Sequence, residues 1–126
     1  MEEAKTGAGE SGMSLEAEAD RSVVRAWGEI DLTVRRDATQ LCAEVVERGL
    51  PLVIDTRDVT FIDSTGMSIL VRLARDAESN GYPVELHNPP WMLRELLTIT
   101  GVDRILPIAD GESSAGPASA AGDGQG

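Results

Sequence analysis

The chain has 126 residues, of which 41% are hydrophobic and only 3% aromatic, and its formal net charge at pH 7 is −11. This length and apolar fraction indicate one globular domain with a largely aliphatic core. The negative charge argues against nucleic acid and against an anionic membrane surface as partners, because both require clustered lysine and arginine.

The acidic residues are concentrated at the two ends of the chain. Residues 1–20 hold six carboxylates and one lysine, and residues 109–126 hold three carboxylates and no basic residue. Both ends are polar and contain glycine, so neither can bury enough apolar surface to offset the entropy lost on ordering. We therefore expect a disordered segment over residues 1–13, one folded domain over residues 14–108 and a flexible tail over residues 109–126.

The sequence offers little for binding a metal or crossing a membrane. Cys42 is the single cysteine and His87 the single histidine, so we expect neither a disulfide nor a metal site. No apolar run approaches the roughly 20 residues of a transmembrane helix, and residues 1–10 are too acidic for a signal peptide. We expect a cytoplasmic protein without a cofactor, in which Cys42 is a small buried hydrophobic residue.

Strand patterns recur along the central region. Residues 15–19 alternate apolar and polar side chains, and residues 23–30 resume a strand after a short turn, which predicts a hairpin. Residues 51–55 are a short apolar run rich in β-branched side chains, which is typical of a buried parallel strand. Residues 83–87 and 105–108 predict two further strands, the last of them at an edge.

Three helical patterns separate these strands. The first helix begins at a cap formed by Asp31 or Thr33 and ends at Gly49. Its apolar face consists of Val34, Ala38, Leu41, Cys42, Val45 and Val46. The second helix spans about residues 64–79, and the third spans about residues 90–100. The apolar face of the second consists of Gly66, Met67, Leu70, Leu73, Ala74 and Ala77. Strands that alternate with helices predict an α/β fold with mostly parallel pairing.

The stretch FIDSTGM at residues 61–67 places a carboxylate and two hydroxyls beside a glycine, where a strand gives way to a helix. One interpretation is a helix cap, since Asp63, Ser64 and Thr65 can each accept from the free N–H groups of the first turn. Another is a modifiable helix start. A phosphate on Ser64 would add about −1.5 to −2 charges there and repel a partner adapted to the neutral hydroxyl. Gly66 would leave room for the phosphate or the partner.

A catalytic serine is the third interpretation of this stretch. The strand-to-helix elbow of hydrolases reads G-x-S-x-G, and Ile62 stands where its first glycine should be. His87 is the sole candidate base, and its place at the end of a predicted strand suits a polar residue that faces solvent. We therefore expect no catalytic residue in this chain.

Two motifs resemble the STAS domains of bacterial anti-sigma factor antagonists. Ile62-Asp63-Ser64-Thr65-Gly66 is similar to the family signature between a strand and a helix, and Gly28-Glu29-Ile30-Asp31 is similar to its G-E-[LI]-D. Residues 51–55 and 101–108 also match the family pattern, so the resemblance covers about residues 15–108. It implies a small α/β domain without enzymatic activity, in which a mixed sheet of four to five strands carries its helices mainly on one side.

The resemblance also implies a function. Such domains bind an anti-sigma factor that is itself a serine/threonine kinase of the histidine-kinase-like ATPase type, and they thereby release the sigma factor. The kinase phosphorylates the serine of D-S-[ST]-G, which ends the binding, and a phosphatase resets the domain. On this chain the implied acceptor is Ser64. The implied docking face consists of Asp31, Val34, Asp63, Thr65, Gly66, Met67 and Ser68.

Other interpretations stay open from sequence alone. Some family members are non-switching scaffold subunits of larger stress-signalling or transport complexes, although the presence of Ser64 favours the switch. At least one of Met67 and Ile69 should be exposed beside Ser64, as suits a docking patch. Trp27 and Trp91 either anchor a partner or, as we favour, cover an edge of the core.

Overall fold

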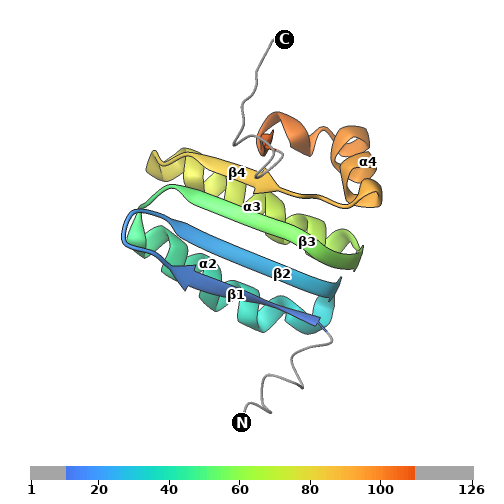
Figure 1. The fold of residues 1–126 in the computed structure, drawn as a ribbon, viewed down its shortest axis with the longest axis horizontal. Helices are drawn as coiled ribbons and strands as arrows, with labels where there is room; N and C mark the ends of the chain where they lie inside the picture. Colours follow the sequence, from blue (N-terminus) through green and yellow to red (C-terminus); the bar gives the residue numbers. More distant parts are fainter. Residues whose placement is uncertain (1–10, 110–126) are drawn as a thin grey trace.

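Residues 11–109 are described by a computed structural model, and they form a mixed five-stranded sheet with three α-helices (Figure 1). The strands are β1 (Ser11–Ala17), β2 (Ser22–Ile30), β3 (Leu52–Ile62), β4 (Val84–His87) and β5 (Ile108–Ala109). They lie across the sheet in chain order, with β1 antiparallel to β2 and every other neighbouring pair parallel. The predicted α/β class and mixed sheet are confirmed.

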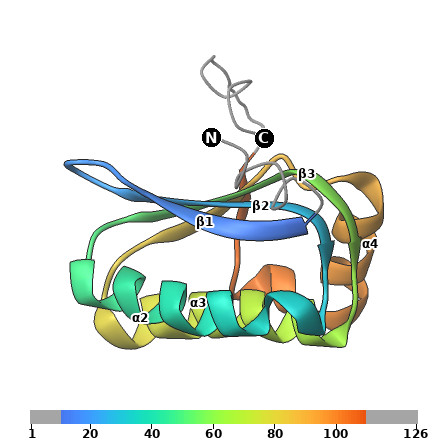
Figure 2. The ribbon, with the colours of Figure 1, turned by 90° about the horizontal axis from the view of Figure 1, so that it is seen from below.

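The helices cover one face of this sheet. The helical segments are η1 (Leu32–Val34), α2 (Arg35–Arg48), α3 (Ser64–Asn80), α4 (Trp91–Thr100) and η2 (Val102–Arg104). Figure 2 shows α2 and α3 side by side beneath the sheet, with α4 beyond the end of β3. This arrangement confirms that the helices pack mainly on one side. No helix within residues 11–109 is both long and apolar enough to cross a bilayer.

The core between the sheet and the helices is aliphatic, as the low aromatic content predicts. Val24, Ile54 and Leu86 from three strands are fully buried against Leu73 of α3 and Leu97 of α4. Burial of side chains of this size stabilises the fold by about 1.5–3 kcal/mol each. The core therefore holds α2 and α3 against the sheet and positions the starts of both helices.

α2 follows a separate 3-10 turn, where the sequence predicts one continuous helix. Asp31 caps this turn, and α2 begins only at Arg35. The helix ends at Gly49, whose φ of 62° is a left-handed conformation that glycine adopts without strain. Val34, between the two helical segments, is buried in the core.

α3 agrees with its predicted span to within one residue at its end. Its predicted apolar face is confirmed at five positions, since Gly66, Leu70, Leu73, Ala74 and Ala77 are buried. Ile69 is also buried, whereas Met67 is half-buried and packs at the margin of the core. We expected Met67 or Ile69 to be exposed. This expectation is met only in part, because Met67 is half-buried and Ile69 is buried.

β3 extends to Ile62, well beyond the predicted end at Asp55. β4 pairs with β3 only as far as Asp55, and the rest of β3 pairs with β2. Arg57 and Asp58 face solvent in this second half. The apolar run therefore marks only the first half of β3, and the more polar second half is a strand because it pairs with β2.

β1 begins at Ser11, inside the segment predicted to be disordered over residues 1–13, and it ends at Ala17. Antiparallel pairing with β2 supplies backbone hydrogen bonds, and these bonds order the polar residues at the start of β1. The predicted strand residues beyond Ala17 belong to the turn, where the Glu18 N–H donates to the Arg21 carbonyl at 3.0 Å. The remaining terminal predictions, at residues 1–10 and 110–126, lie outside the described residues.

The last strand is shorter than predicted and shifted along the chain. The sequence predicts a strand at residues 105–108, whereas β5 consists of Ile108–Ala109. The N–H groups of Ile105 and Leu106 both donate to the Val102 carbonyl at 3.0 Å, so they close the η2 turn instead of pairing with β4. Apolar character alone does not distinguish such a turn from an edge strand.

Candidate functional site

The starts of η1 and α3 lie together at the carboxyl end of the sheet. β2 and β3 are parallel and pair Ile30 with Ile62 in register. Asp31 and Asp63 are the next residues of the two strands, so both leave the sheet at the same edge. The Asp63 N–H donates to the Ile30 carbonyl at 3.4 Å. Segments more than 30 residues apart in the chain thus form one surface, as expected from two parallel strands.

Both aspartates are helix caps. Asp31 Oδ1 accepts hydrogen bonds from the Thr33 hydroxyl at 2.7 Å and from the Thr33 N–H at 3.0 Å. These two bonds hold the pKa of the Asp31 carboxyl below its ordinary value, so Asp31 is ionised at neutral pH. Asp63 Oδ1 accepts from the Gly66 N–H at 3.0 Å and caps α3. Two negative charges therefore flank the surface.

Gly66 has a structural role that differs from the one expected. A Cβ atom at this position would lie 2.3 Å from the Ile30 carbonyl oxygen and 2.5 Å from Ile62 Cγ1. The expectation that Gly66 leaves room for a phosphate or a partner is wrong, because the ends of β2 and β3 already occupy that space. The glycine lets the first turn of α3 approach the sheet closely.

Ser64 is the first residue of α3, and its side chain is exposed. Asp63 already serves as the cap, and the Ser64 hydroxyl has no hydrogen-bond partner among residues 11–109. The next two hydroxyls differ in exposure. Thr65 is half-buried, and Ser68 is exposed and donates to the Thr65 carbonyl at 2.8 Å. Ser64 is thus an accessible hydroxyl at the positive end of a helix.

Val34 is the predicted docking residue that the structure places elsewhere. Its side chain is only 3% exposed and packs in the core, so the expectation that it contacts a partner is wrong. Val34 is buried at the end of the 3-10 turn, as its place on the predicted apolar face of the first helix indicates. Only the docking role that the family resemblance implies is wrong. Val34 therefore stabilises the surface from beneath instead of forming part of it.

Two exposed apolar side chains at this edge were missed from the sequence. Leu32 follows Asp31 and is 60% exposed, and Phe61 lies two residues before Asp63 and is 50% exposed. Large apolar side chains that face solvent beside polar ones are typical of docking sites. No periodicity could have identified Phe61, because strict alternation from the buried Val59 places it on the buried face, whereas two exposed residues separate Val59 from Ile62 in β3.

The two tryptophans differ in exposure. Trp27 of β2 is half-buried and lies against Gly12 of β1, where an added Cβ would approach its ring to 2.8 Å. Trp91, the first residue of α4, is 75% exposed. Trp27 therefore packs on β1 and is not among the side chains that pack against the core, so the expectation that the tryptophans cover an edge of the core is not confirmed for Trp27 and is wrong for Trp91.

The structure gives Ser64 no histidine partner. His87 lies at the end of β4, and its Nε2 atom is 3.0 Å from Glu85 Oε1 on the same strand. His87 also lines a separate pocket that Ser64 does not share. No cluster of three or more potential metal ligands occurs within residues 11–109. Within the described part of the chain, Ser64 therefore lacks the histidine base that a nucleophilic serine commonly uses.

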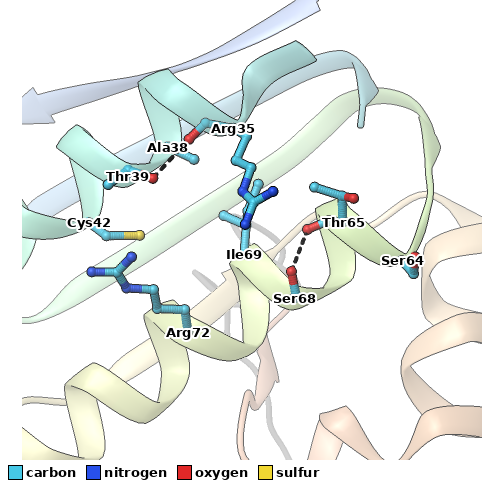
Figure 3. Close-up of a pocket in the computed structure, with 9 residues that line it drawn as sticks. All are labelled: Arg35, Ala38, Thr39, Cys42, Ser64, Thr65, Ser68, Ile69 and Arg72. Atoms are coloured by element: carbon cyan, nitrogen blue, oxygen red, sulfur yellow. Dashed lines mark hydrogen bonds between the residues drawn. The ribbon is translucent and has the colours of Figure 1, made fainter. Parts of the chain in front are cut away.

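A groove of about 420 Å³ runs between α2 and α3 and reaches the start of α3 (Figure 3). Its lining residues are Arg35, Ala38, Thr39, Cys42, Ser64, Thr65, Ser68, Ile69 and Arg72. Cys42 is buried, and this burial raises the pKa of its thiol, so the thiol is neutral. Ser64 thus lies at the end of a polar groove, where α3 begins.

Comparison with known proteins places this arrangement in a family. The STAS domain family matches residues 13–115. The anti-sigma-B factor antagonist of Bacillus subtilis is 30% identical over 86 residues, which cover 68% of this chain and 79% of that protein.

Solved structures share the fold. An anti-sigma factor antagonist from Mycobacterium paratuberculosis is 29% identical with a TM-score of 0.68, over 82% of this chain and 88% of that one. The phosphorylated form of the Bacillus cell fate determinant SpoIIAA is 20% identical with a TM-score of 0.65, over 82% and 96% respectively. Together with the match of the family over most of the chain, these similarities show that the protein belongs to the STAS domain family.

Proposed function

We propose that this protein is an anti-sigma factor antagonist that is switched by phosphorylation. In its unphosphorylated form it binds an anti-sigma factor in the cytoplasm and so releases the sigma factor, and phosphorylation of Ser64 ends the binding. The observation that carries the proposal is the exposed Ser64 hydroxyl at the start of α3, which the Asp63 cap leaves without a structural role. The similarity to anti-sigma factor antagonists of Bacillus subtilis and Mycobacterium paratuberculosis supports the antagonist part of the proposal.

The partner in this proposal is an anti-sigma factor that is also a serine/threonine kinase of the histidine-kinase-like ATPase type. The kinase transfers the γ-phosphoryl group of ATP to Ser64 Oγ, the hydroxyl proton passes to a base of the kinase, and ADP leaves. A phosphatase then hydrolyses the phosphoserine to serine and inorganic phosphate. This chain supplies an accessible acceptor and needs no catalytic group or cofactor of its own.

The docking surface combines apolar contact area with charge. It consists of Asp31, Leu32, Phe61, Asp63, Ser64, Thr65, Met67 and Ser68. Leu32 and Phe61 supply the exposed apolar area, and the two aspartates supply negative charge on either side. An interface of this kind buries an apolar centre and excludes water from it.

A phosphate on Ser64 suits a switch on physical grounds. The free N–H groups and the dipole at the start of α3 accommodate the added charge, so the domain stays folded. The partner, however, would have to desolvate a dianion beside Asp31 and Asp63, which costs several kcal/mol. Reversal of a binding equilibrium from 1:99 to 99:1 requires about 5.5 kcal/mol. One phosphate near the centre of the contact is therefore sufficient.

A pull-down from lysate of the source cells tests the proposal. The baits are the wild type, Ser64→Ala and Ser64→Asp, with Ser79→Asp as a matched control, because Ser79 is exposed near the other end of α3. We expect Ser64→Ala and the control to retain an ATPase kinase that Ser64→Asp loses. Retention of the same partners by all baits would refute the switch and support a non-switching scaffold.

A further inference from the structure

The groove between α2 and α3 carries a charge opposite to that of the protein as a whole. The chain has a net charge of −11, yet the charged residues that line the groove are Arg35 and Arg72, with no carboxylate among them. Its polar lining otherwise consists of the hydroxyls of Thr39, Ser64, Thr65 and Ser68. The hydroxyls of Thr39 and Ser68 already donate to the carbonyls of Arg35 and Thr65. The groove is thus a cationic site whose further donors are the hydroxyls of Ser64 and Thr65.

The two arginines enter the groove from opposite walls, as Figure 3 shows. Arg35 extends from the first turn of α2 toward Thr65 and Ile69 on α3, and Arg72 extends from α3 back toward Cys42. The Arg35 guanidinium group forms neither an ion pair nor a hydrogen bond with any residue of the described range 11–109, although the Arg35 carbonyl accepts from the Thr39 hydroxyl at 3.0 Å. The fold therefore holds one guanidinium group in the groove without a counter-charge.

Arg72 is only weakly neutralised. Its Nε atom lies 3.6 Å from Asp76 Oδ2, which is longer than a hydrogen bond, and its side chain is 51% exposed. Cys42 on the groove wall adds no negative charge, because burial raises the pKa of its thiol. Both guanidinium groups are therefore available to an anion that enters the groove.

We propose that this groove is a binding site for a phosphate group, held by Arg35 and Arg72. The planar guanidinium group donates two parallel hydrogen bonds to phosphate oxygens, and the Thr65 hydroxyl can donate one more. The groove also opens at the start of α3, whose dipole favours a negative charge. The phosphate can belong to a free molecule or to phosphorylated Ser64, which lines the same groove; the second source depends on the proposed function.

The first arm of the test uses the unphosphorylated full chain and inorganic phosphate. Two-dimensional ¹H–¹⁵N NMR follows the side-chain Nε–H signals of both arginines at constant ionic strength. We expect saturable shifts for phosphate and none for acetate. Arg35→Gln and Arg72→Gln should each weaken binding about tenfold, as the loss of a charge-assisted contact predicts. Arg36→Gln should change nothing, because Arg36 is equally exposed but does not line this groove.

The second arm uses the chain phosphorylated on Ser64 and follows the phosphate signal by ³¹P NMR against pH. Arg35→Gln should raise the second pKa of this phosphate, since a nearby guanidinium favours the dianion, and Arg36→Gln should leave it unchanged. Circular dichroism confirms that every variant folds. A response in the first arm alone assigns the site to free phosphate, and a response in the second alone assigns it to phosphorylated Ser64.

The proposal is overturned if neither arm depends on Arg35 or Arg72, or if Arg36→Gln or acetate reproduces the effects. The first arm needs no phosphorylated protein. A failure of Ser64 to accept phosphate would therefore refute the proposed function and leave the groove proposal to be decided by inorganic phosphate alone.

Discussion

Gly66→Ala tests how the start of α3 is held against the sheet. The new Cβ would lie 2.3 Å from the Ile30 carbonyl oxygen, which belongs to the backbone and cannot swing aside. The first turn of α3 must therefore move by roughly 1 Å, and overpacking of this kind costs about 1–3 kcal/mol. The same movement strains the hydrogen bond from the Gly66 N–H to Asp63, which is worth about 1 kcal/mol.

An opposing effect limits the loss of stability. Alanine has a higher helix propensity than glycine, by up to about 1 kcal/mol in a helix interior. We therefore expect Gly66→Ala to lower the free energy of unfolding by about 1–3 kcal/mol, measured by urea denaturation with fluorescence or circular dichroism. Gly66→Ser should cost at least as much, because its side chain is larger.

Ser68→Ala is the control for this measurement. Ser68 is exposed on the next turn of α3, so its replacement should change stability by no more than about 0.5 kcal/mol. If Gly66→Ala is as stable as the wild type or more stable, helix propensity dominates, and the close approach of α3 to Ile30 is not what requires glycine.

Three further predictions concern the same edge of the sheet. Asp63→Ala should lower the free energy of unfolding, measured in urea, by about 1 kcal/mol, whereas Asp63→Asn should retain most of the capping energy. Equal losses of stability in the two variants would contradict a capping role. Because the folded-state pKa of Asp31 is depressed, its contribution to stability is present above the unfolded value of about 3.9 and is lost as the pH falls through the folded pKa. Asp31→Asn should therefore reduce the acid dependence of thermal unfolding below about pH 4, and an unchanged profile would contradict this. Leu32→Ser and Phe61→Ser should each weaken binding of the anti-sigma factor at least about tenfold in calorimetry. The free energy of unfolding should change by no more than about 0.5 kcal/mol, because both side chains are exposed. An unchanged affinity would exclude the substituted residue from the interface.

The order and type of the elements were predictable because they depend on local periodicity. The spacing of apolar side chains along α2 and α3 identifies the faces that the core buries. The boundaries of the strands were less predictable. β1 and the second half of β3 consist largely of polar or alternating residues, and pairing with β2 is what makes them strands.

The candidate site was predictable where its parts are adjacent in the chain. Asp63, Ser64 and Gly66 lie within four residues, and their place between an apolar strand and an amphipathic helix indicates a helix start. Their separate roles were not predictable. Only the backbone geometry of the turn shows that Asp63, and not Ser64, is the cap. Position 66 requires glycine because it contacts Ile30, which lies on another strand.

The α/β class, the order of the elements and the hydroxyl at the start of a helix all follow from the sequence alone, because spacing along the chain controls each of these. The exposure of Leu32 and Phe61, in contrast, depends on the folded structure. The same is true of the groove that Arg35 and Arg72 share. These features arise where segments that are distant in the chain meet. They could not be predicted, because neither composition nor periodicity indicates which side chains face one another across such contacts.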